Sequence, residues 1–134
     1  MSKLVQLSEA VSIAIHSMVL IAQAEGKINV STIAECTGSS KNHLAKVMQR
    51  LVKQGLLSSN RGPAGGFILK RPASEITILE IYECIEGKLE SEGCPNNKQI
   101  CHFSKCIMGG IMKRVTDEFI VHFKSHTIQD FITG

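Results

Sequence analysis

The sequence of 134 residues predicts a mainly α-helical fold: a helix-turn-helix, a two-stranded β-wing after it, and a long helix near the C-terminus. Two helical patterns of apolar residues meet at a tight turn centred on Gly38, which is typical of a helix-turn-helix. The Gly- and Pro-rich residues 61–66 separate two short apolar runs, as in a hairpin. Apolar residues recur at helical spacing from about Ser104 to His126 and predict the long helix.

The first two helices are predicted from capping residues and helical spacing. Ser8 can cap a helix that continues to about Gly26, and its many apolar residues predict burial on most sides. Ser31 can cap a short second helix, which Gly38 ends.

The third helix would follow the turn, with Ser39 or Ser40 as its cap and Gly55 as its end. Its inward face is predicted by four apolar residues at positions i, i+3, i+4 and i+7: Leu44, Val47, Met48 and Leu51. Its other face is polar and basic. The wing would then consist of residues 56–59, the Gly- and Pro-rich tip, and residues 67–69.

The C-terminal half is predicted to begin with a capping box, Thr77–Glu80, which opens another helix. Residues 88–102 lack periodicity and are expected to form a loop. The long helix after it carries an apolar stripe that would be a dimer seam: Met108, Ile111, Met112, Val115, Phe119 and Phe123. Thr127 would start a short last turn. The predicted domains are a winged helix-turn-helix, 1–72, and a cysteine loop with a dimerisation helix, 73–134.

Charge is distributed unevenly along the chain, although the net charge is only +3. Between Cys36 and Ser74 there is no Asp or Glu, and this stretch holds seven of the fifteen Lys and Arg residues. From Glu75 to Glu92 the balance inverts. A basic segment that coincides with a helix-turn-helix and a wing indicates binding to duplex DNA, which should weaken steeply with salt.

The third helix would enter the major groove with its N-terminal end first. Asn42 and Gln49 could read adenine edges, and Lys41 and Lys46 could reach guanine or phosphate. Arg61 in the wing could reach a minor groove. The residues expected to contact DNA come from the turn, the helix and the wing: Ser39, Ser40, Lys41, Asn42, His43, Lys46, Gln49, Arg50, Arg61, Gly62 and Gly65.

The chain has five cysteines and no recognisable secretion signal, so we expect a cytoplasmic protein with reduced thiols. Cys94, Cys101 and Cys106 fall in a loop with Gly, Pro and Asn, where thiolates can converge on one metal centre. Their spacing matches neither zinc ribbons nor ferredoxin runs, which leaves an iron–sulfur cluster and other uses open. Cys36 and Cys84 occupy predicted core positions and are expected to be small buried hydrophobic residues.

The wing and its flanks carry a family resemblance. Residues 51–69 read LVKQGLLSSNRGPAGGFIL, and with the helix before them and the cysteine loop after them they resemble the IscR/NsrR/CymR-type (Rrf-two) regulators. This resemblance implies a winged-helix transcription regulator that dimerises through its long C-terminal helix. Relatives with three loop cysteines hold a [2Fe–2S] or [4Fe–4S] cluster. By resemblance, Cys94, Cys101 and Cys106 are the metal ligands and Arg61 is the wing arginine.

The fourth cluster ligand stays open. Some relatives have a His three residues after the third cysteine, where this chain has Gly109. Others use an acidic residue early in the first helix, where the best match is Ser12. Glu9 and His16 lie about one turn either side of Ser12, and either could reach a cluster, as could His102.

We therefore expect a homodimeric DNA-binding regulator, a repressor at a pseudo-palindromic operator, whose operator affinity is switched by an iron–sulfur cluster. By resemblance, it would sense iron–sulfur status, nitric oxide or redox state. The alternatives are a cluster-free thiol- or zinc-responsive regulator, and a metal-binding adaptor that does not bind DNA. An enzyme is not expected, since the sequence has no nucleophile–base motif, phosphate loop or paired acid site. No membrane span is expected, because no stretch approaches about 18 uninterrupted apolar residues.

Overall fold

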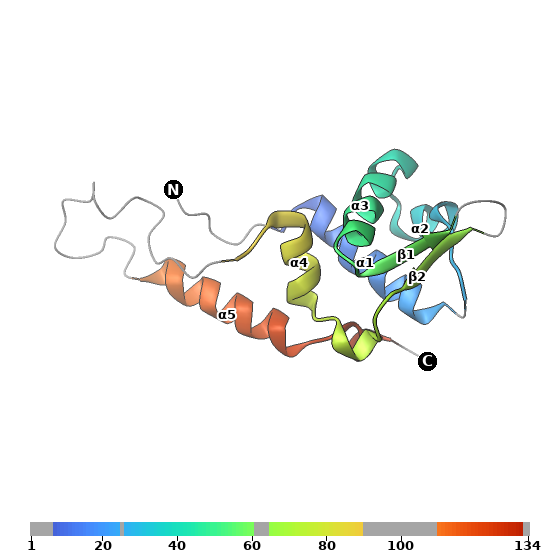
Figure 1. Cartoon of the computed structure of the whole chain (residues 1–134). Coiled ribbons are helices and arrows are strands. Elements are labelled where there is room, and N and C mark those ends of the chain that lie inside the picture. The colour runs from blue at the N-terminus through green and yellow to red at the C-terminus, as the bar shows by residue number, and fades with distance from the viewer. Residues whose placement is uncertain (1–6, 25, 61–64, 90–109, 133–134) are drawn as a thin grey trace.

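The computed structural model describes residues 7–24, 26–60, 65–89 and 110–132. Helices α1, α2 and α3 gather with the hairpin, α4 packs against α1, α3 and α5, and α5 extends away from the other elements (Figure 1). In chain order the elements are α1 (Glu9–Gln23), α2 (Val30–Thr37), α3 (Lys41–Lys53), β1 (Leu57–Asn60), β2 (Gly66–Leu69), η1 (Ala73–Glu75), α4 (Ile78–Glu86), α5 (Ile111–Ser125) and η3 (Ile128–Phe131). The predicted mainly α-helical winged helix is confirmed.

Capping residues set the helix boundaries, with one correction to the sequence analysis. The hydroxyls of Ser8 and Ser40 cap α1 and α3, accepting from the backbone N–H three residues on at 3.2 and 3.1 Å. Gly38 ends α2 in the left-handed conformation, at φ 69°. The cap predicted for α2 is wrong: Asn29, not Ser31, accepts from the N–H three residues on, at 2.8 Å. Asn caps a helix as well as Ser does, so α2 starts at the earlier residue.

A single hydrophobic core joins the N-terminal and C-terminal parts of the described chain. The predicted inward residues of α3 are all buried in it: Leu44, Val47, Met48 and Leu51. Ile81 of α4 and Ile128 of η3 are fully buried in the same cluster as Met18 of α1. The predicted parts 1–72 and 73–134 therefore share their core, and the division between them stays a prediction.

The wing is attached to the segment that precedes α2. β1 and β2 pair antiparallel, with Ser59 opposite Phe67. Phe67 also forms a bridge with Ile28, through hydrogen bonds of 2.9 and 3.4 Å. At Gly66, an added Cβ atom would lie only 2.6 Å from the carbonyl oxygen of Ile28. Glycine is therefore required here by the close approach of two backbones.

Gly66→Ala is expected to lower the free energy of unfolding by about 1–3 kcal/mol, because the new methyl group must push two backbones apart. Urea unfolding of the variant and the wild type measures this difference. Ser59→Ala, an exposed position on the paired strand, is the control and should change stability by less than about 0.5 kcal/mol. Equal stability of Gly66→Ala and the wild type would contradict the close approach.

The start of α4 keeps half of the predicted capping box. Thr77 Oγ1 accepts a hydrogen bond from the Glu80 N–H at 3.1 Å, as predicted. The Glu80 carboxylate instead accepts from the guanidinium of Arg71, at 2.5 and 3.3 Å. The guanidinium is charged and binds the carboxylate through two hydrogen bonds, so it is preferred over the single backbone N–H of the helix cap.

Helix α5 begins at Ile111, later than the start predicted near Ser104. Gly110, just before it, has φ 76°, a left-handed conformation that cannot belong to the helix. The apolar residue Met108 of the predicted stripe lies outside the described residues.

The two ends of α5 have different surroundings. Near its C-terminal end, Phe119 and Phe123 pack edge-on against Tyr82 of α4, with ring centroids 5.2 and 6.1 Å apart. Near its N-terminal end the helix extends past α4 (Figure 1), and Ile111 and Val115 are 42% and 37% exposed. One apolar stripe thus starts in the core and continues onto the surface.

Candidate nucleic-acid interface

The exposed face of α3 carries most of the residues predicted to contact DNA. Burial of the opposite face fixes the rotation of the helix, which leaves exposed the side chains of Lys41, Asn42, Lys46 and Gln49. His43 is half-buried on the first turn. The structure therefore brings two bases and two amides together on one accessible helix face.

The turn before α3 presents the N-terminal end of the helix. The Thr37 hydroxyl donates to the Ile33 carbonyl at 2.9 Å and lies 2.5 Å from the hydroxyl of Ser39. Ser40 is exposed, and Ser39 is half-buried beside it. These hydrogen bonds hold the turn. Because Ser40 and the first residues of α3 are exposed, the positive end of the helix dipole is accessible to an anion such as a phosphate.

Residues 61–64 of the wing, which include Arg61 and Gly62, lie outside the described residues, and Gly65 is half-buried. A base that the sequence analysis missed lies at the same wing. The Asn60 amide, in the orientation that satisfies its neighbours, accepts from Lys27 Nζ at 2.5 Å. Lys27 precedes the bridge between Ile28 and the wing, and this long-range pairing has no signal in the sequence.

Two bases of the acid-free segment make contacts within the chain. The Arg71 guanidinium binds the Glu80 carboxylate and the Glu75 carbonyl, the latter at 2.7 Å. Its hydrogen bond to Glu80 raises the pKa of Arg71 above its ordinary value. The guanidinium of Arg50, a residue predicted from the sequence to contact DNA, donates to the carbonyl of Ile85 in α4 at 2.9 Å.

The two cysteines outside the loop differ from expectation. Cys36 is exposed, so the prediction that it is buried is wrong. The short helix α2 buries only one face, through Ile33 and Ala34, and Cys36 lies off that face. Cys84 is half-buried, and its thiol donates to the Arg50 carbonyl at 3.5 Å. Burial raises the pKa of Cys84, while the nearby charge of Arg50 acts in the opposite direction.

The predicted metal ligands Cys94, Cys101 and Cys106, with His102, lie outside the described residues. The described chain resumes at Gly110, and α5 begins at the next residue. Within the described ranges, no group of three His, Cys, Asp or Glu side chains could hold a metal ion.

The two described candidates for a fourth ligand lie at different places on α1. Glu9 is exposed at the start of the helix, where the hydroxyl of Ser8 donates to the Glu86 carboxylate of α4 at 2.5 Å. Glu9 is therefore near the end of α4, which residues 87–89 connect to the segment 90–109. His16 is exposed, and its Nδ1 lies 2.7 Å from the Ser12 carbonyl, which leaves Nε2 available to a partner.

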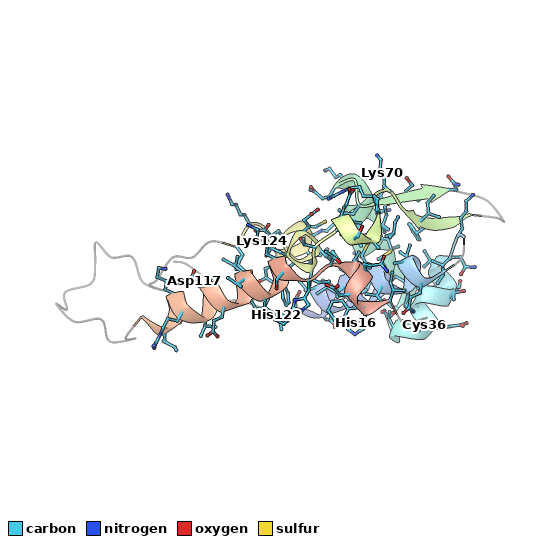
Figure 2. All side chains as sticks on the ribbon, turned by 90° about the horizontal axis from the view of Figure 1, so that it is seen from below. His16, Cys36, Lys70, Asp117, His122 and Lys124 are labelled. Carbon is cyan, nitrogen blue, oxygen red and sulfur yellow. The ribbon has the colours of Figure 1, made fainter. Side chains whose placement is uncertain are left out.

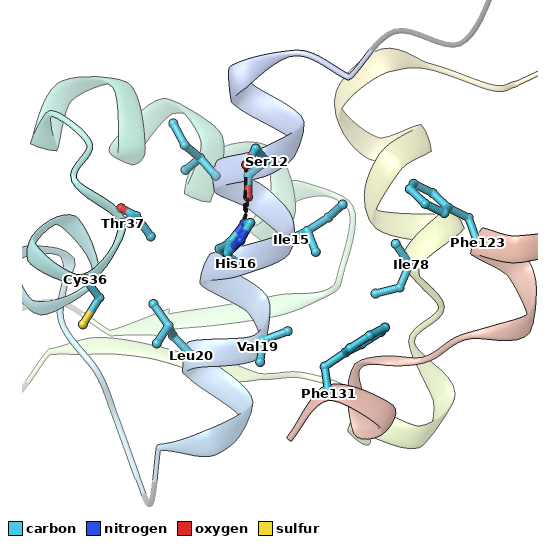
Figure 3. Close-up of a pocket in the computed structure, with 11 residues that line it drawn as sticks. Ser12, Ile15, His16, Val19, Leu20, Cys36, Thr37, Ile78, Phe123 and Phe131 are labelled. Atoms are coloured by element: carbon cyan, nitrogen blue, oxygen red, sulfur yellow. Dashed lines mark hydrogen bonds between the residues drawn. The ribbon is translucent and has the colours of Figure 1, made fainter. Parts of the chain in front are cut away.

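A surface pocket of about 610 Å³ lies beside His16. Its wall is mainly apolar and comes from α1, α2, the first residue of α4, and the aromatic rings of Phe123 and Phe131 (Figure 3). His16 and Cys36 both line it. Lys70, after the wing, lies on one side of the molecule, whereas His16 and Cys36 lie on the other (Figure 2).

None of the described helices is long and apolar enough to cross a membrane.

Comparisons with known proteins identify regulators that resemble this chain in sequence and in fold. The family model described as "Rrf2: Iron-dependent Transcriptional regulator" matches residues 7–134. The HTH-type transcriptional regulator IscR of Photorhabdus laumondii is 26% identical over 122 residues, which cover 91% of this chain and 71% of that protein.

Two solved structures have the same fold. That of CymR, described as the global cysteine regulator of B. subtilis, matches with a TM-score of 0.78 at 22% identity, over 94% of this chain and 95% of CymR. That of T. potens IscR matches with a TM-score of 0.74 at 26% identity, over 94% of this chain and 85% of that one. Both similarities include the long C-terminal part as well as the winged helix.

Proposed function

The chain belongs to the Rrf2 family of transcriptional regulators, and from this premise we propose that it is a homodimer that reads a pseudo-palindromic operator and responds to an iron–sulfur cluster. Binding to DNA and regulation of transcription come with the family. Our proposal adds which residues contact DNA and where the dimer seam lies. It also adds that a cluster binds and that the outcome is repression.

The proposed DNA contact is supported by the exposed polar face of α3, which lies beside the accessible N-terminus of the same helix. Lys41 and Lys46 would bind phosphate or guanine, and Asn42 and Gln49 would bind adenine edges. Ser39, Ser40 and His43 would position the first turn on the backbone. Arg61, Gly62 and Gly65 of the wing would follow the adjacent minor groove.

The dimer is supported by the apolar stripe of α5. Its exposed part, Ile111 and Val115, continues the row of Phe119 and Phe123, which are packed against the chain's own α4. A second copy, related by a two-fold axis, would cover this part with the same surface of its own α5. The two α3 helices would then face two half-sites roughly 34 Å, or a multiple of this, apart.

The donor set of the cysteine segment suits an iron–sulfur cluster. Cys94, Cys101 and Cys106 would supply three thiolates, which are the usual ligands of such clusters. Glu9 lies near the end of α4, where this segment begins, and is the best supported fourth ligand among the described residues. A bound cluster would supply a centre that reacts with oxidants and nitric oxide. We propose that iron–sulfur status, redox state or nitric oxide is therefore the signal.

The salt dependence of DNA binding tests the proposed interface. The probe is a duplex that the wild-type protein selects from a random-sequence pool. Lys46→Met should weaken binding and reduce the slope of log affinity against log salt by about 0.9, because one phosphate contact is lost. Lys88→Met is the control: Lys88 is exposed after α4, in the acidic part of the chain, and the slope should stay unchanged.

Two results would contradict the proposal. If the wild-type protein retains no duplex at any salt concentration, the result supports the alternative of a metal-binding adaptor that does not bind DNA. If it retains duplex but anaerobically isolated protein contains zinc, or no metal, the chain is a cluster-free regulator.

A further inference from the structure

Arg50 lies in the last turn of the DNA-reading helix, well away from the end that would enter the groove. It lies ten positions after the cap Ser40, which is roughly 15 Å along an α-helix. Its guanidinium donates to the carbonyl of Ile85 at 2.9 Å, across 35 positions of sequence. The charge of Arg50 is therefore directed at α4.

This contact supplies a hydrogen-bond donor to a backbone carbonyl at the C-terminal end of α4. The last four carbonyls of a helix have no partner inside the helix, and a cation there is favoured by the helix dipole. In α4 the Gly87 N–H donates to the Glu83 carbonyl at 2.9 Å, and Arg50 supplies the donor for Ile85. Arg50 thus caps the C-terminal end of a helix other than its own.

A second hydrogen bond runs in the opposite direction between the same two helices. The Cys84 thiol of α4 donates to the backbone carbonyl of Arg50 at 3.5 Å. The pair of bonds joins the backbone of each helix to a side chain of the other. These two hydrogen bonds, the thiol being the weaker donor, hold the last turn of α3 against the C-terminal end of α4.

We propose that Arg50 is a positioning residue, which sets the orientation of α3 on DNA by joining it to the C-terminal end of α4, and that it contacts no phosphate. The DNA-binding part of this inference rests on the proposed function. The end of α4 is also where the cysteine segment departs: the Leu89 N–H donates to the Glu83 carboxylate at 2.9 Å. The link therefore joins the reading helix to the last described residues before that segment.

The test compares Arg50→Met with Lys46→Met, since both remove one positive charge from α3 and keep an unbranched stem. Two quantities are measured on the anaerobically isolated full chain, in the state in which the wild type selected the duplex: the salt slope of binding to that duplex, and the hydrogen exchange of the amides of residues 85–89. Arg50→Met should lower affinity roughly 2- to 30-fold at every salt concentration, with the slope unchanged. It should also accelerate exchange several-fold at the end of α4, because this end loses its cap.

Lys46→Met should give the reverse pattern, with a smaller salt slope and unchanged exchange. Arg50→Lys keeps a cationic donor, should restore slow exchange, and remains available if Arg50→Met does not fold. A slope that falls by about 0.9 in Arg50→Met, with unchanged exchange, would overturn the inference and make Arg50 a phosphate contact. If the wild-type protein binds no duplex, the proposed function fails, while the exchange data still decide whether Arg50 caps α4.

Discussion

Val115→Asp is expected to convert the proposed dimer into monomers and to lower operator affinity by roughly 100-fold or more, because each half-site must then be bound separately. Val115 lies on the exposed continuation of the apolar stripe of α5, where a seam would bury it against the second copy. A carboxylate without a cationic partner in such a seam is strongly unfavourable. Sedimentation or light scattering gives the mass, and titration of the selected duplex gives the affinity.

Val121→Asp is the matched control for this experiment. Val121 is 66% exposed on the same helix, but it lies off the stripe, so the same chemical change should leave the mass and the affinity unchanged. The folded state of both variants can be checked by circular dichroism. A Val115→Asp protein that remains dimeric would contradict the proposed seam.

Cys101→Ala is expected to abolish the visible absorbance of anaerobically isolated protein, because two remaining thiolates cannot hold the cluster as three do. It should also remove the difference in duplex affinity between the metal-loaded and metal-free protein. Absorption spectra and iron analysis measure the first effect, and binding titrations at fixed salt measure the second.

Cys36→Ala is the control, because Cys36 is exposed on α2 and is outside the predicted trio. It should keep the absorbance and the difference in affinity. If Cys101→Ala keeps its colour, or if metal-loaded and metal-free wild-type proteins bind DNA equally, the proposed switch is wrong. The DNA-binding role would be unaffected by either outcome.

The sequence predicted the reading helix well, since its signals are local. The cap Ser40 and the four buried residues of α3 lie within one continuous segment, where capping and helical periodicity act over a few residues. The same reasoning misplaced the start of α2, because Asn29 and Ser31 are both good caps and only one can be used. The three cysteines stood out because they cluster in one predicted loop and match the family resemblance, and their role remains a prediction because they lie outside the described residues.

By itself, the sequence determined the order of the elements, the inward face of α3 and the acid-free, basic character of the segment proposed to read DNA. Only the tertiary structure decided where individual polar side chains went. Arg50 donates to a carbonyl at the end of α4, and Arg71 binds the Glu80 carboxylate that would otherwise complete the capping box. Gly66 is needed because the backbone of Ile28 lies too close for a side chain. In each case the partner belongs to another segment of the chain than the residue itself, and which partners a side chain can bind depends on which segments the fold brings within about 3 Å.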